Sequence, residues 1–237
     1  MNDELLTISS LNAGYGGQYV LNDFSLNIPK GQQIGLIGPN GCGKSSLLKS
    51  ITANIPETVG KITFNNKIIT NMETNHVINQ GIGYMKQTHN IFTGLTVKEN
   101  LEIASTNNRA RNSQQLDLLL NAFPILAPLM EMRAGLMSGG ERQALAASMV
   151  LSHKLSLLLL DEPLAGLSVK SATELLRGIS VLQQEEGFSM VIVEHRLDLI
   201  QPYVDRVIVM VRGEIYEDTT DTKILSNQQQ LEKHFLS

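Results

Sequence analysis

The sequence predicts an α/β fold in which a parallel sheet is joined by an antiparallel β subdomain and an inserted helical subdomain. Short apolar runs of the kind that fill buried parallel strands recur along the chain, at residues 34–37, 81–85, 155–160 and 189–193. Between 88 and 152 the pattern is helical and no further strand of this kind appears. We therefore expect one domain over 1–237, with an α/β core at 1–87 and 153–237 and a helical subdomain at 88–152.

The antiparallel β subdomain is expected to consist of strands that precede and follow the apolar run at residues 34–37. Residues 5–11 alternate apolar and polar side chains, and a glycine-rich turn at 14–17 leads into a second strand at 20–28. A hairpin is expected where Asn65-Asn66 separates two short strands, because two asparagines suit a two-residue turn.

The helical segment carries its own start and stop signals. Thr96 and Glu99 have the spacing of a capping box and predict a helix over 97–104, followed by an exposed loop at 105–115. A second helix, 114–123, should end before Pro124, and a third is expected at 142–152. Beyond the last core strand we expect a hairpin of 207–211 with 214–216 and a short polar helix at about 222–236.

Composition excludes several functional classes. The chain has 237 residues, of which 42% are hydrophobic and 18% charged, and its formal net charge is −4. Without an excess of basic residues, a nucleic-acid partner is not expected. A single cysteine, Cys42, fits a reducing compartment. No signal peptide is visible, and no apolar run approaches the roughly 20 residues of a membrane span. We expect a cytoplasmic protein whose membrane role, if any, comes through a partner.

One stretch between a buried strand and a helix has the spacing G-x-x-x-x-G-K-S. Its residues are Gly38, Pro39, Asn40, Gly41, Cys42, Gly43, Lys44, Ser45 and Ser46. Glycines there let backbone N–H groups surround an anion, while Lys44 would reach the β- and γ-phosphates and Ser45 would bind Mg²⁺. The alternative, a glycine-rich turn without a ligand, leaves the Lys-Ser pair unexplained. Cys42 occupies one of the x positions of this motif, so it needs no chemical role.

A second glycine-rich site precedes the helix at 142–152. Ser138 and Glu141 have capping-box spacing, which by itself requires no ligand. Gly139 and Gly140 weaken the helix they begin, since glycine is about 1 kcal/mol worse than alanine in a helix. Their lack of side chains exposes the positive end of that helix, which favours a phosphate ligand.

Acidic residues and a histidine follow two of the predicted core strands. Asp161 could hold Mg²⁺, and Glu162 could polarise a water for attack on a γ-phosphate. The alternative is an acidic pair that merely ends a strand. His195 follows the neighbouring apolar run, where it could contact the γ-phosphate rather than serve only as a structural hydrogen bonder. Tyr15, about 23 residues before the phosphate loop, could stack on a nucleotide base or remain a rim residue.

Together these residues resemble the ATP-binding-cassette ATPases, over nearly the whole chain. Gly38 to Ser46 matches the phosphate loop, Leu157 to Glu162 the second nucleotide motif, and Met137 to Glu141 the signature sequence. In the same family, Gln87 matches the glutamine that senses Mg²⁺ and the attacking water. His195 matches the switch histidine, and Tyr15 the aromatic residue that stacks on adenine.

The resemblance implies ATP and Mg²⁺ as cofactors and a head-to-tail dimer with a second ATPase subunit, in which the Ser138 loop of one copy caps the ATP of the other. Ser168 stands where many cassettes carry aspartate, so coupling between the two sites is expected to differ. Residues 90–92 and 95–101, with Ser168 and the segment 193–196, resemble the ATPase subunits of importers for branched-chain amino acids and related polar solutes.

An importer subunit would work at the inner face of the membrane with transmembrane permease subunits and, indirectly, a solute-binding protein. Ile91, Phe92 and Leu95 are candidates for the permease contact, or alternatively core of the helical subdomain. A soluble or exporting cassette ATPase is the competing function, and an inactive scaffold is disfavoured by the intact motifs. The chain has neither the long insertions of repair and chromosome cassettes nor a second cassette.

Overall fold

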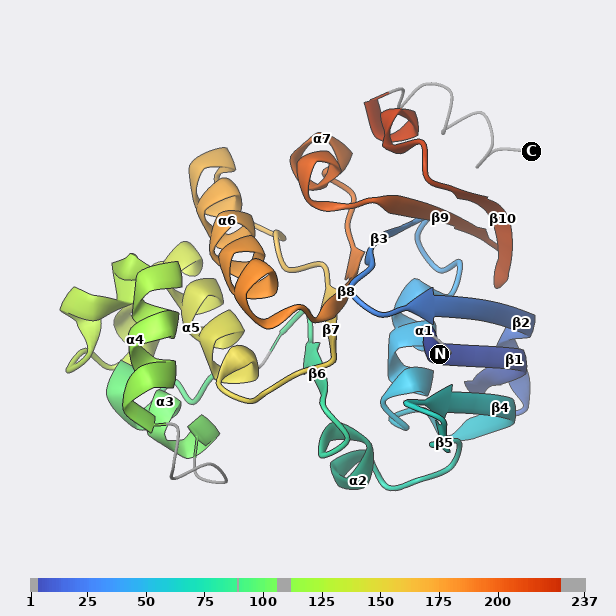
Figure 1. Ribbon diagram of the computed structural model, residues 1–237, viewed down its shortest axis with the longest axis horizontal. Coiled ribbons are helices and arrows are strands. Elements are labelled where there is room, and N and C mark those ends of the chain that lie inside the picture. The colour runs from blue at the N-terminus through green and yellow to red at the C-terminus, as the bar shows by residue number, and fades with distance from the viewer. Residues whose placement is uncertain (1–3, 89, 106–111, 227–237) are drawn as a thin grey trace. The chain divides into compact units, whose positions relative to one another are not determined.

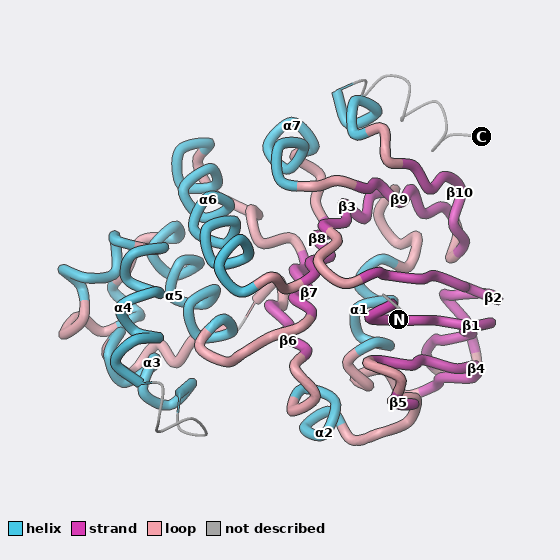
Figure 2. The backbone as a smooth tube through the Cα atoms, in the orientation of Figure 1, coloured by secondary structure: helices cyan, strands magenta, loops and turns pink. Residues whose placement is uncertain are grey.

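The computed structural model describes residues 4–88, 90–105 and 112–226. By its internal contacts the chain forms two compact units, each described here by itself. Unit 1 comprises residues 1–84, 156–161 and 188–237, and unit 2 comprises residues 85–155 and 162–187. Figure 1 labels the elements of both units, and Figure 2 separates their helices from their strands. Unit 1 holds the two sheets, whereas unit 2 is helical.

Unit 1 begins with a four-stranded antiparallel sheet in the order β2-β1-β4-β5. Its strands are β1 (Glu4–Tyr15), β2 (Gln18–Pro29), β4 (Glu57–Phe64) and β5 (Lys67–Ile68). Asn65 and Asn66, with φ of 47° and 64°, make the turn between β4 and β5. Both residues adopt the left-handed conformation that two-residue hairpins require, so the predicted hairpin is confirmed.

The second sheet of unit 1 has six strands in the order β10-β9-β3-β8-β7-β6. The strands are β3 (Gln33–Ile37), β6 (Ile82–Met85), β7 (Leu157–Asp161), β8 (Ser189–Val193), β9 (Arg206–Val211) and β10 (Glu214–Thr219). β3 pairs in parallel with both β8 and β9, and β7 in parallel with β8, while β10 pairs antiparallel with β9. The parallel core and its antiparallel hairpin are as the sequence predicts. β7 and β8 are buried throughout, which accounts for their uninterrupted apolar sequences.

Helix α1 (Lys44–Ile51) joins the two sheets, since it packs against β1 and β2 of one and β7 of the other. Its buried Leu47, Leu48 and Ile51 belong to a core cluster that draws on both sheets. The remaining elements of unit 1 are short: α2 (Thr74–Ile78), α7 (Leu197–Ile200) and the 3₁₀ turns Gln201–Tyr203 and Thr222–Ser226.

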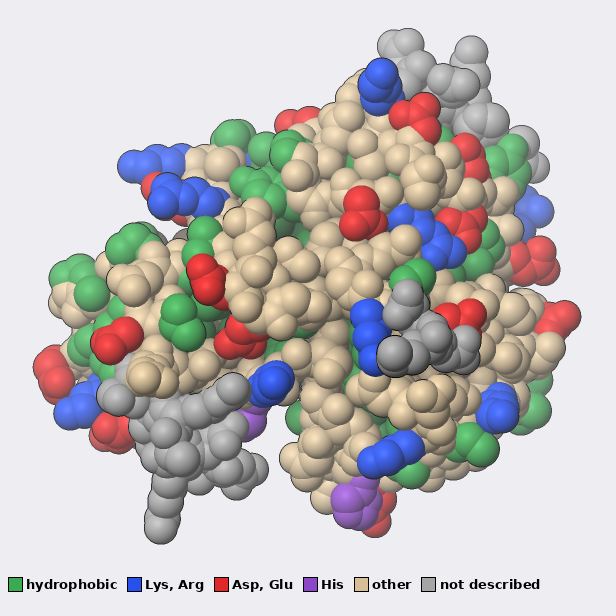
Figure 3. Space-filling view, in the orientation of Figure 1, with side chains coloured by type: hydrophobic (Ala, Val, Ile, Leu, Met, Phe, Trp, Pro, Cys, Tyr) green, Lys and Arg blue, Asp and Glu red, His purple; other side chains and the backbone are tan. Residues whose placement is uncertain are grey.

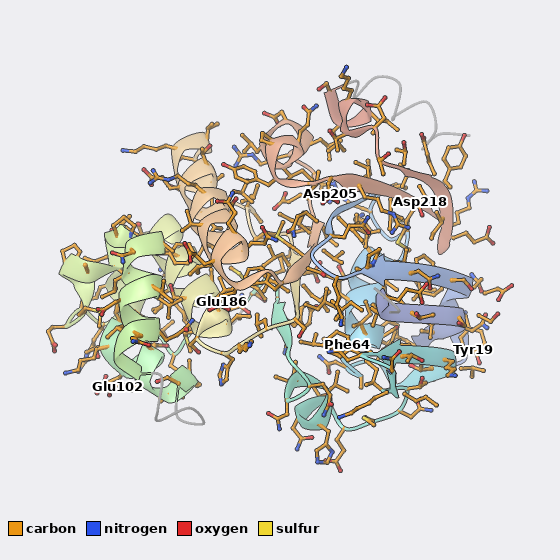
Figure 4. The ribbon with its side chains drawn as sticks, in the orientation of Figure 1. Tyr19, Phe64, Glu102, Glu186, Asp205 and Asp218 are labelled. Carbon is orange, nitrogen blue, oxygen red and sulfur yellow. The ribbon has the colours of Figure 1, made fainter. Side chains whose placement is uncertain are left out.

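Arg206 fixes the outer hairpin of the parallel sheet. Its guanidinium donates to both carboxylate oxygens of Asp218 and to the main-chain oxygen of Asn27 at 2.8 Å. Asp205 beside it accepts from the Gln33 N–H at 3.2 Å, and burial raises the pKa of that carboxyl. Asp205 and Asp218 are labelled in Figure 4, and Figure 3 shows acidic and basic side chains interspersed over the visible face.

Unit 2 contains four α-helices among its described residues. They are α3 (Val97–Ser105), α4 (Asn112–Ala122), α5 (Gly139–Leu151) and α6 (Val169–Glu186), with 3₁₀ turns at Pro124–Leu129 and Ala134–Leu136. α5 packs against α3 and α6, and α6 also packs against α4. Both predicted capping boxes form: Thr96 with Glu99, and Ser138 with Glu141.

Some predicted boundaries differ from the structure. The exposed loop predicted to Gln115 is wrong from Asn112 onward, because α4 begins there and Gln115 is buried, donating to the Leu151 carbonyl at 3.1 Å. The helix predicted from Arg142 already begins at Gly139. The segment 162–187, which the sequence reading placed in the α/β core, groups with unit 2 because α6 packs on α4 and α5. Of the predicted C-terminal helix, only Thr222–Ser226 is described, and residues 227–236 lie outside the described part.

Candidate functional site

The glycine-rich loop of unit 1 connects β3 to α1, as the spacing predicts. Gly38 has φ of 152°, and a Cβ there would lie 2.1 Å from the Met210 carbonyl oxygen, so no larger residue fits. Lys44 is 6% exposed, and its ammonium donates to the carbonyls of Gly38 at 2.7 Å and Pro39 at 2.9 Å. The loop is therefore closed around the amine that the sequence assigns to phosphate.

The first turn of α1 presents N–H groups without a side-chain cap. Gly43 occupies the N-cap with φ of 109°, and no side chain accepts a hydrogen bond from this turn. Regular helical bonding begins when the Leu47 N–H donates to the Gly43 carbonyl at 2.8 Å. Uncapped donors at the positive end of a helix suit an anionic ligand.

Ser45 and Asp161 are brought together from positions 116 residues apart. The Ser45 hydroxyl donates to one carboxylate oxygen of Asp161 at 2.8 Å, and the Tyr84 hydroxyl donates to the other at 3.1 Å. Burial, and then the Asp161 charge and hydrogen bond, raise the pKa of Tyr84, so its hydroxyl stays protonated. A hydroxyl and a carboxylate at the carboxyl end of β7 are hard oxygen ligands that fit Mg²⁺.

Cys42 lies in the same loop with a buried side chain. Its sulfur is 3.8 Å from the Lys44 ammonium. Burial raises the pKa of the thiol, although Lys44 partly offsets this, so the side chain remains neutral. Cys42 thus contributes packing and its main chain to the loop.

In unit 2, Gln87 and Glu162 are direct neighbours. The Gln87 amide donates to a Glu162 carboxylate oxygen at 2.9 Å. Glu162 has φ of 51° and precedes Pro163, so its backbone holds a conformation that side-chain-bearing residues seldom adopt. Such conformations persist where surrounding structure enforces them, and they cluster at functional sites. Both residues were singled out from the sequence, and the structure brings their side chains together.

The Ser138 loop precedes α5 in the same unit. The Ser138 N–H donates to the Glu141 carboxylate at 2.7 Å, and the Ser138 hydroxyl accepts from the Glu141 N–H at 3.4 Å. A Cβ on Gly139 would make only an ordinary contact, 3.8 Å from Leu167, whereas one on Gly140 would lie 2.9 Å from the Ser171 side chain. Packing thus explains Gly140 but leaves Gly139 unexplained.

Tyr15 is the last residue of β1, and its side chain is 42% exposed. The turn that follows is held by Glu57, whose carboxylate oxygens accept from the Gly17 N–H at 2.9 and 3.1 Å. The Lys49 ammonium lies 5.9 Å from the centre of the Tyr15 ring, within cation–π range. The Tyr15 ring is thus presented from a fixed turn rather than packed into the core.

His195 is exposed and lies two residues beyond the end of β8. Its main-chain N–H donates to the carboxylate of the buried Glu194 at 3.1 Å. β7 and β8 are neighbours, and both end at this edge of the parallel sheet. His195 therefore stands at the same sheet edge as Asp161, as the sequence predicts.

Three side chains of this site were missed by sequence reasoning. Tyr84, Glu57 and Lys49 belong to no motif, because each is defined by a partner that is distant in sequence. Only Tyr84 had a usable signal, since it lies near the end of an apolar strand run, where ligand-binding residues of α/β folds gather.

The chain is similar to known proteins over most of its length. A family model described as ABC transporter matches residues 21–165. The Probable branched-chain amino acid transport ATP-binding protein LivF of Archaeoglobus fulgidus is 36% identical over 225 residues, covering 94% of this chain and 95% of that protein. The High-affinity branched-chain amino acid transport ATP-binding protein BraG of Pseudomonas aeruginosa is 32% identical over 224 residues, covering 94% and 96%.

A solved structure titled as the ADP conformation of an ATP-binding cassette of an ABC transporter superposes with a TM-score of 0.83. It is 26% identical in sequence and covers 99% of both chains. Among the described residues, none of the helices has the length and apolar character needed to cross a bilayer.

Proposed function

Because the chain belongs to the ATP-binding subunits of ABC transporters and is an ATPase, we propose that it drives an importer of branched-chain amino acids or related polar solutes. The observation that carries this proposal is the likeness to the LivF and BraG proteins, which extends over 94% of the chain in both cases. Both of these relatives are named for branched-chain amino acid transport. The names of these two relatives do not support the competing function, a soluble or exporting cassette.

Nucleotide binding is assigned to the loop between β3 and α1. Lys44 would exchange its two carbonyl contacts for the β- and γ-phosphates, and the uncapped N–H groups of α1 would hold the remaining phosphate oxygens. Tyr15 would stack on the adenine. Ser45 and Asp161 would hold Mg²⁺, which neutralises charge on the transferred phosphoryl group when bound.

Hydrolysis is assigned to Glu162 as the general base. The Gln87 amide, 2.9 Å from the Glu162 carboxylate, would orient that carboxylate and sense the water and metal. His195 would contact the γ-phosphate. A general base contributes about 10²–10⁴ in rate, so Glu162 should dominate turnover among these three.

The Ser138 loop would act on a second ATPase subunit. Ser138, Gly139, Gly140 and Glu141 would close over the ATP held by the phosphate loop of the other copy, whether identical or a close relative. The free space around Gly139 supports this role, because nothing else in unit 2 accounts for its missing side chain. Hydrolysis would remove the bridging charge and reopen the dimer.

The permease contact is assigned to Phe92 and its neighbours. Phe92 is 52% exposed, while its main chain is fixed by buried Asn100, which accepts from the Phe92 N–H at 2.8 Å and donates to its carbonyl at 3.0 Å. Ile91 and Leu95 are half-buried. A rigidly held, exposed aromatic side chain is typical of a hot spot at an interface. The protein would thus sit at the inner membrane face with permease subunits and, indirectly, a solute-binding protein.

The test is co-purification with co-expressed permease subunits of a branched-chain amino acid importer, followed by leucine uptake into vesicles containing the complex. We expect the wild type to co-purify and to drive ATP-dependent uptake of labelled leucine. Phe92→Asp should lose co-purification, whereas the control Val181→Asp, at a 39% exposed apolar residue of α6, should retain it. ATP hydrolysis with no leucine uptake by an assembled complex would overturn the assigned substrate class.

A further inference from the structure

Unit 2 contains a cavity of about 370 Å³, most of whose lining has no part in the proposed function. It lies between α5, α6 and the residues that follow α4. Buried apolar side chains form one part of its wall, and exposed charged side chains form its rim. The first group is Phe123, Ala144 and Leu175, and the second is Lys170, Glu174 and Arg177. A volume of this size is typical of small-molecule sites.

The elements around this cavity are in close contact with one another. At one point α5 approaches α6 so closely that a Cβ on Gly140 would lie 2.9 Å from Ser171. At another, the Phe123 ring occupies the place of a side chain on Gly178, whose Cβ would lie 2.3 Å from a ring carbon. On the α5 side the cavity wall is formed by the small side chain of Ala144. Protein interiors are otherwise close-packed, so an unfilled apolar wall of this extent favours a ligand.

The charges on the rim narrow the kind of ligand. Lys170, Glu174 and Arg177 are spaced by four and three residues, so they project from one face of α6. Glu141, the fourth charged residue of the lining, already accepts from the Ser138 N–H at 2.7 Å. A purely anionic ligand would meet the Glu174 carboxylate, and a purely cationic one would meet two basic side chains. A molecule that carries both charges on an apolar body can pair with all three groups.

We propose that this cavity binds an apolar α-amino acid, with its ammonium group at Glu174, its carboxylate at Lys170 or Arg177, and its hydrocarbon side chain against Phe123, Ala144 and Leu175. The cavity and its rim charges are independent of the transport assignment. The choice of leucine as the representative ligand rests on the proposed function. Because the rim charges are exposed, each ion pair contributes little and binding is weak.

The position of the cavity implies that a bound amino acid affects ATP turnover. Ser138 and Gly140 line it as well, so a bound amino acid contacts the first turn of α5, which is assigned to the nucleotide of the second subunit. An occupied cavity restrains this turn, and ATP turnover falls. The imported amino acid thereby limits its own uptake from the cytoplasmic side.

The first experiment is an NMR titration of the full-length, nucleotide-free protein with three probes: L-leucine, leucinamide, which lacks the carboxylate, and 4-methylpentanoate, which lacks the ammonium group. L-leucine should shift signals of residues 170–177 and bind severalfold more tightly than either analogue. Glu174→Gln should weaken leucine binding severalfold. The matched control Glu185→Gln, an exposed carboxylate of the same helix outside the cavity, should leave it unchanged. Binding of 4-methylpentanoate as tight as that of leucine, or equal leucine affinity in Glu174→Gln, overturns the proposal.

The second experiment separates this inference from the transport assignment. ATP turnover of each variant is measured with and without L-leucine, and the ratio of the two rates is compared. The wild type and Glu185→Gln should be inhibited, and Glu174→Gln should lose most of the inhibition. A complex that imports leucine but shows the same ratio in Glu174→Gln retains its proposed function and refutes the cavity proposal.

Discussion

The phosphate loop at residues 38–46 and the Ser138 loop at residues 137–141 both place glycines ahead of a helix, yet different surroundings hold them. In the first loop, Gly38 and Gly43 have positive φ angles, and side chains there would collide with Met210 and Leu21 of the same unit. In the second, neither Gly139 nor Gly140 has a positive φ angle.

The contrast is informative about where each loop finds its ligand. The first is complete within unit 1, because Lys44 is already bonded to the loop carbonyl of Gly38 and Ser45 to the Asp161 carboxylate. In the second loop, the capping box satisfies Ser138 and Glu141, and Ser171 explains Gly140, but Gly139 has no structural cause. Nothing within unit 2 prevents residue 139 from carrying a side chain. The glycine at this position therefore indicates that a molecule from outside the unit comes close to it.

The largest expected effect comes from Glu162→Gln. Loss of the general base should lower ATP turnover by about 10²–10⁴. Since ATP is not hydrolysed, it should stay bound between the phosphate loop of one subunit and the Ser138 loop of the other. Size-exclusion chromatography with Mg-ATP should therefore show a dimer. Adding Gly139→Ala to this variant should weaken the dimer without weakening ATP binding by the single subunit. If the Glu162→Gln protein stays monomeric with saturating Mg-ATP, alone and with its natural partner ATPase, the Ser138 loop does not bind the nucleotide of a second subunit.

Lys44→Ala tests the self-contained loop. Removing the buried ammonium eliminates charged hydrogen bonds to phosphate, each contributing about 1.5–3 kcal/mol, so ATP affinity should fall by at least about tenfold. Calorimetry measures this directly, with Lys67→Ala, an exposed lysine of β5, as the control. By contrast, Gly139→Ala should leave the affinity of the single subunit unchanged. Equal ATP affinity in Lys44→Ala and wild type would remove Lys44 from the nucleotide site.

Substitutions at Gly139 and Gly140 should also change the free energy of unfolding in opposite directions. Gly139→Ala should raise the free energy of unfolding by up to about 1 kcal/mol, since alanine is the better helix former and the site has space. Gly140→Ala should lower it by about 1–3 kcal/mol through the clash with Ser171. Denaturant unfolding measures both.

Ser171→Gly in the Gly140→Ala background supplies the control for that clash. It should restore part of the lost stability, because it removes the atoms that the new Cβ meets, although a glycine within α6 costs about 1 kcal/mol itself. No recovery in the double variant would mean that the close approach of α5 and α6 is not what excludes alanine.

Local signals were sufficient for much of the fold. The Asn65-Asn66 turn and the capping boxes at Thr96 and Ser138 act within a few residues, and all three are confirmed. The loop prediction failed at Gln115, because that polar side chain is buried against the Leu151 carbonyl, a contact invisible in local sequence.

Helix α6 was not anticipated although its signals were present. Ser168 caps its start, Gly187 ends it with φ of 73°, and Leu175, Ile179 and Leu182 recur at helical spacing on its buried side. For the site, the motifs identified side chains near Asp161, but the Tyr84 contact depends on strand β6 lying beside β7. Such pairings arise from topology, which residue spacing does not encode.

The smallest expected effect, at Ser168, tests whether the two loops communicate through charge. The Ser168 hydroxyl caps α6 by accepting from the Ser171 N–H at 3.1 Å, a role that aspartate performs equally well. Ser168→Asp should therefore change the free energy of unfolding by less than about 0.5 kcal/mol, whereas Ser168→Ala should lower it by about 1 kcal/mol.

What aspartate adds is a negative charge at the start of α6, close in sequence to Glu162. If charge at this position couples the two sites, Ser168→Asp should raise the Hill coefficient of ATP turnover, and Ser168→Ala should leave it unchanged. An unchanged Hill coefficient in Ser168→Asp, at preserved stability, would mean that serine was retained for its capping oxygen alone. Communication between the loops would then depend on their contact across the dimer and not on the residue that precedes α6.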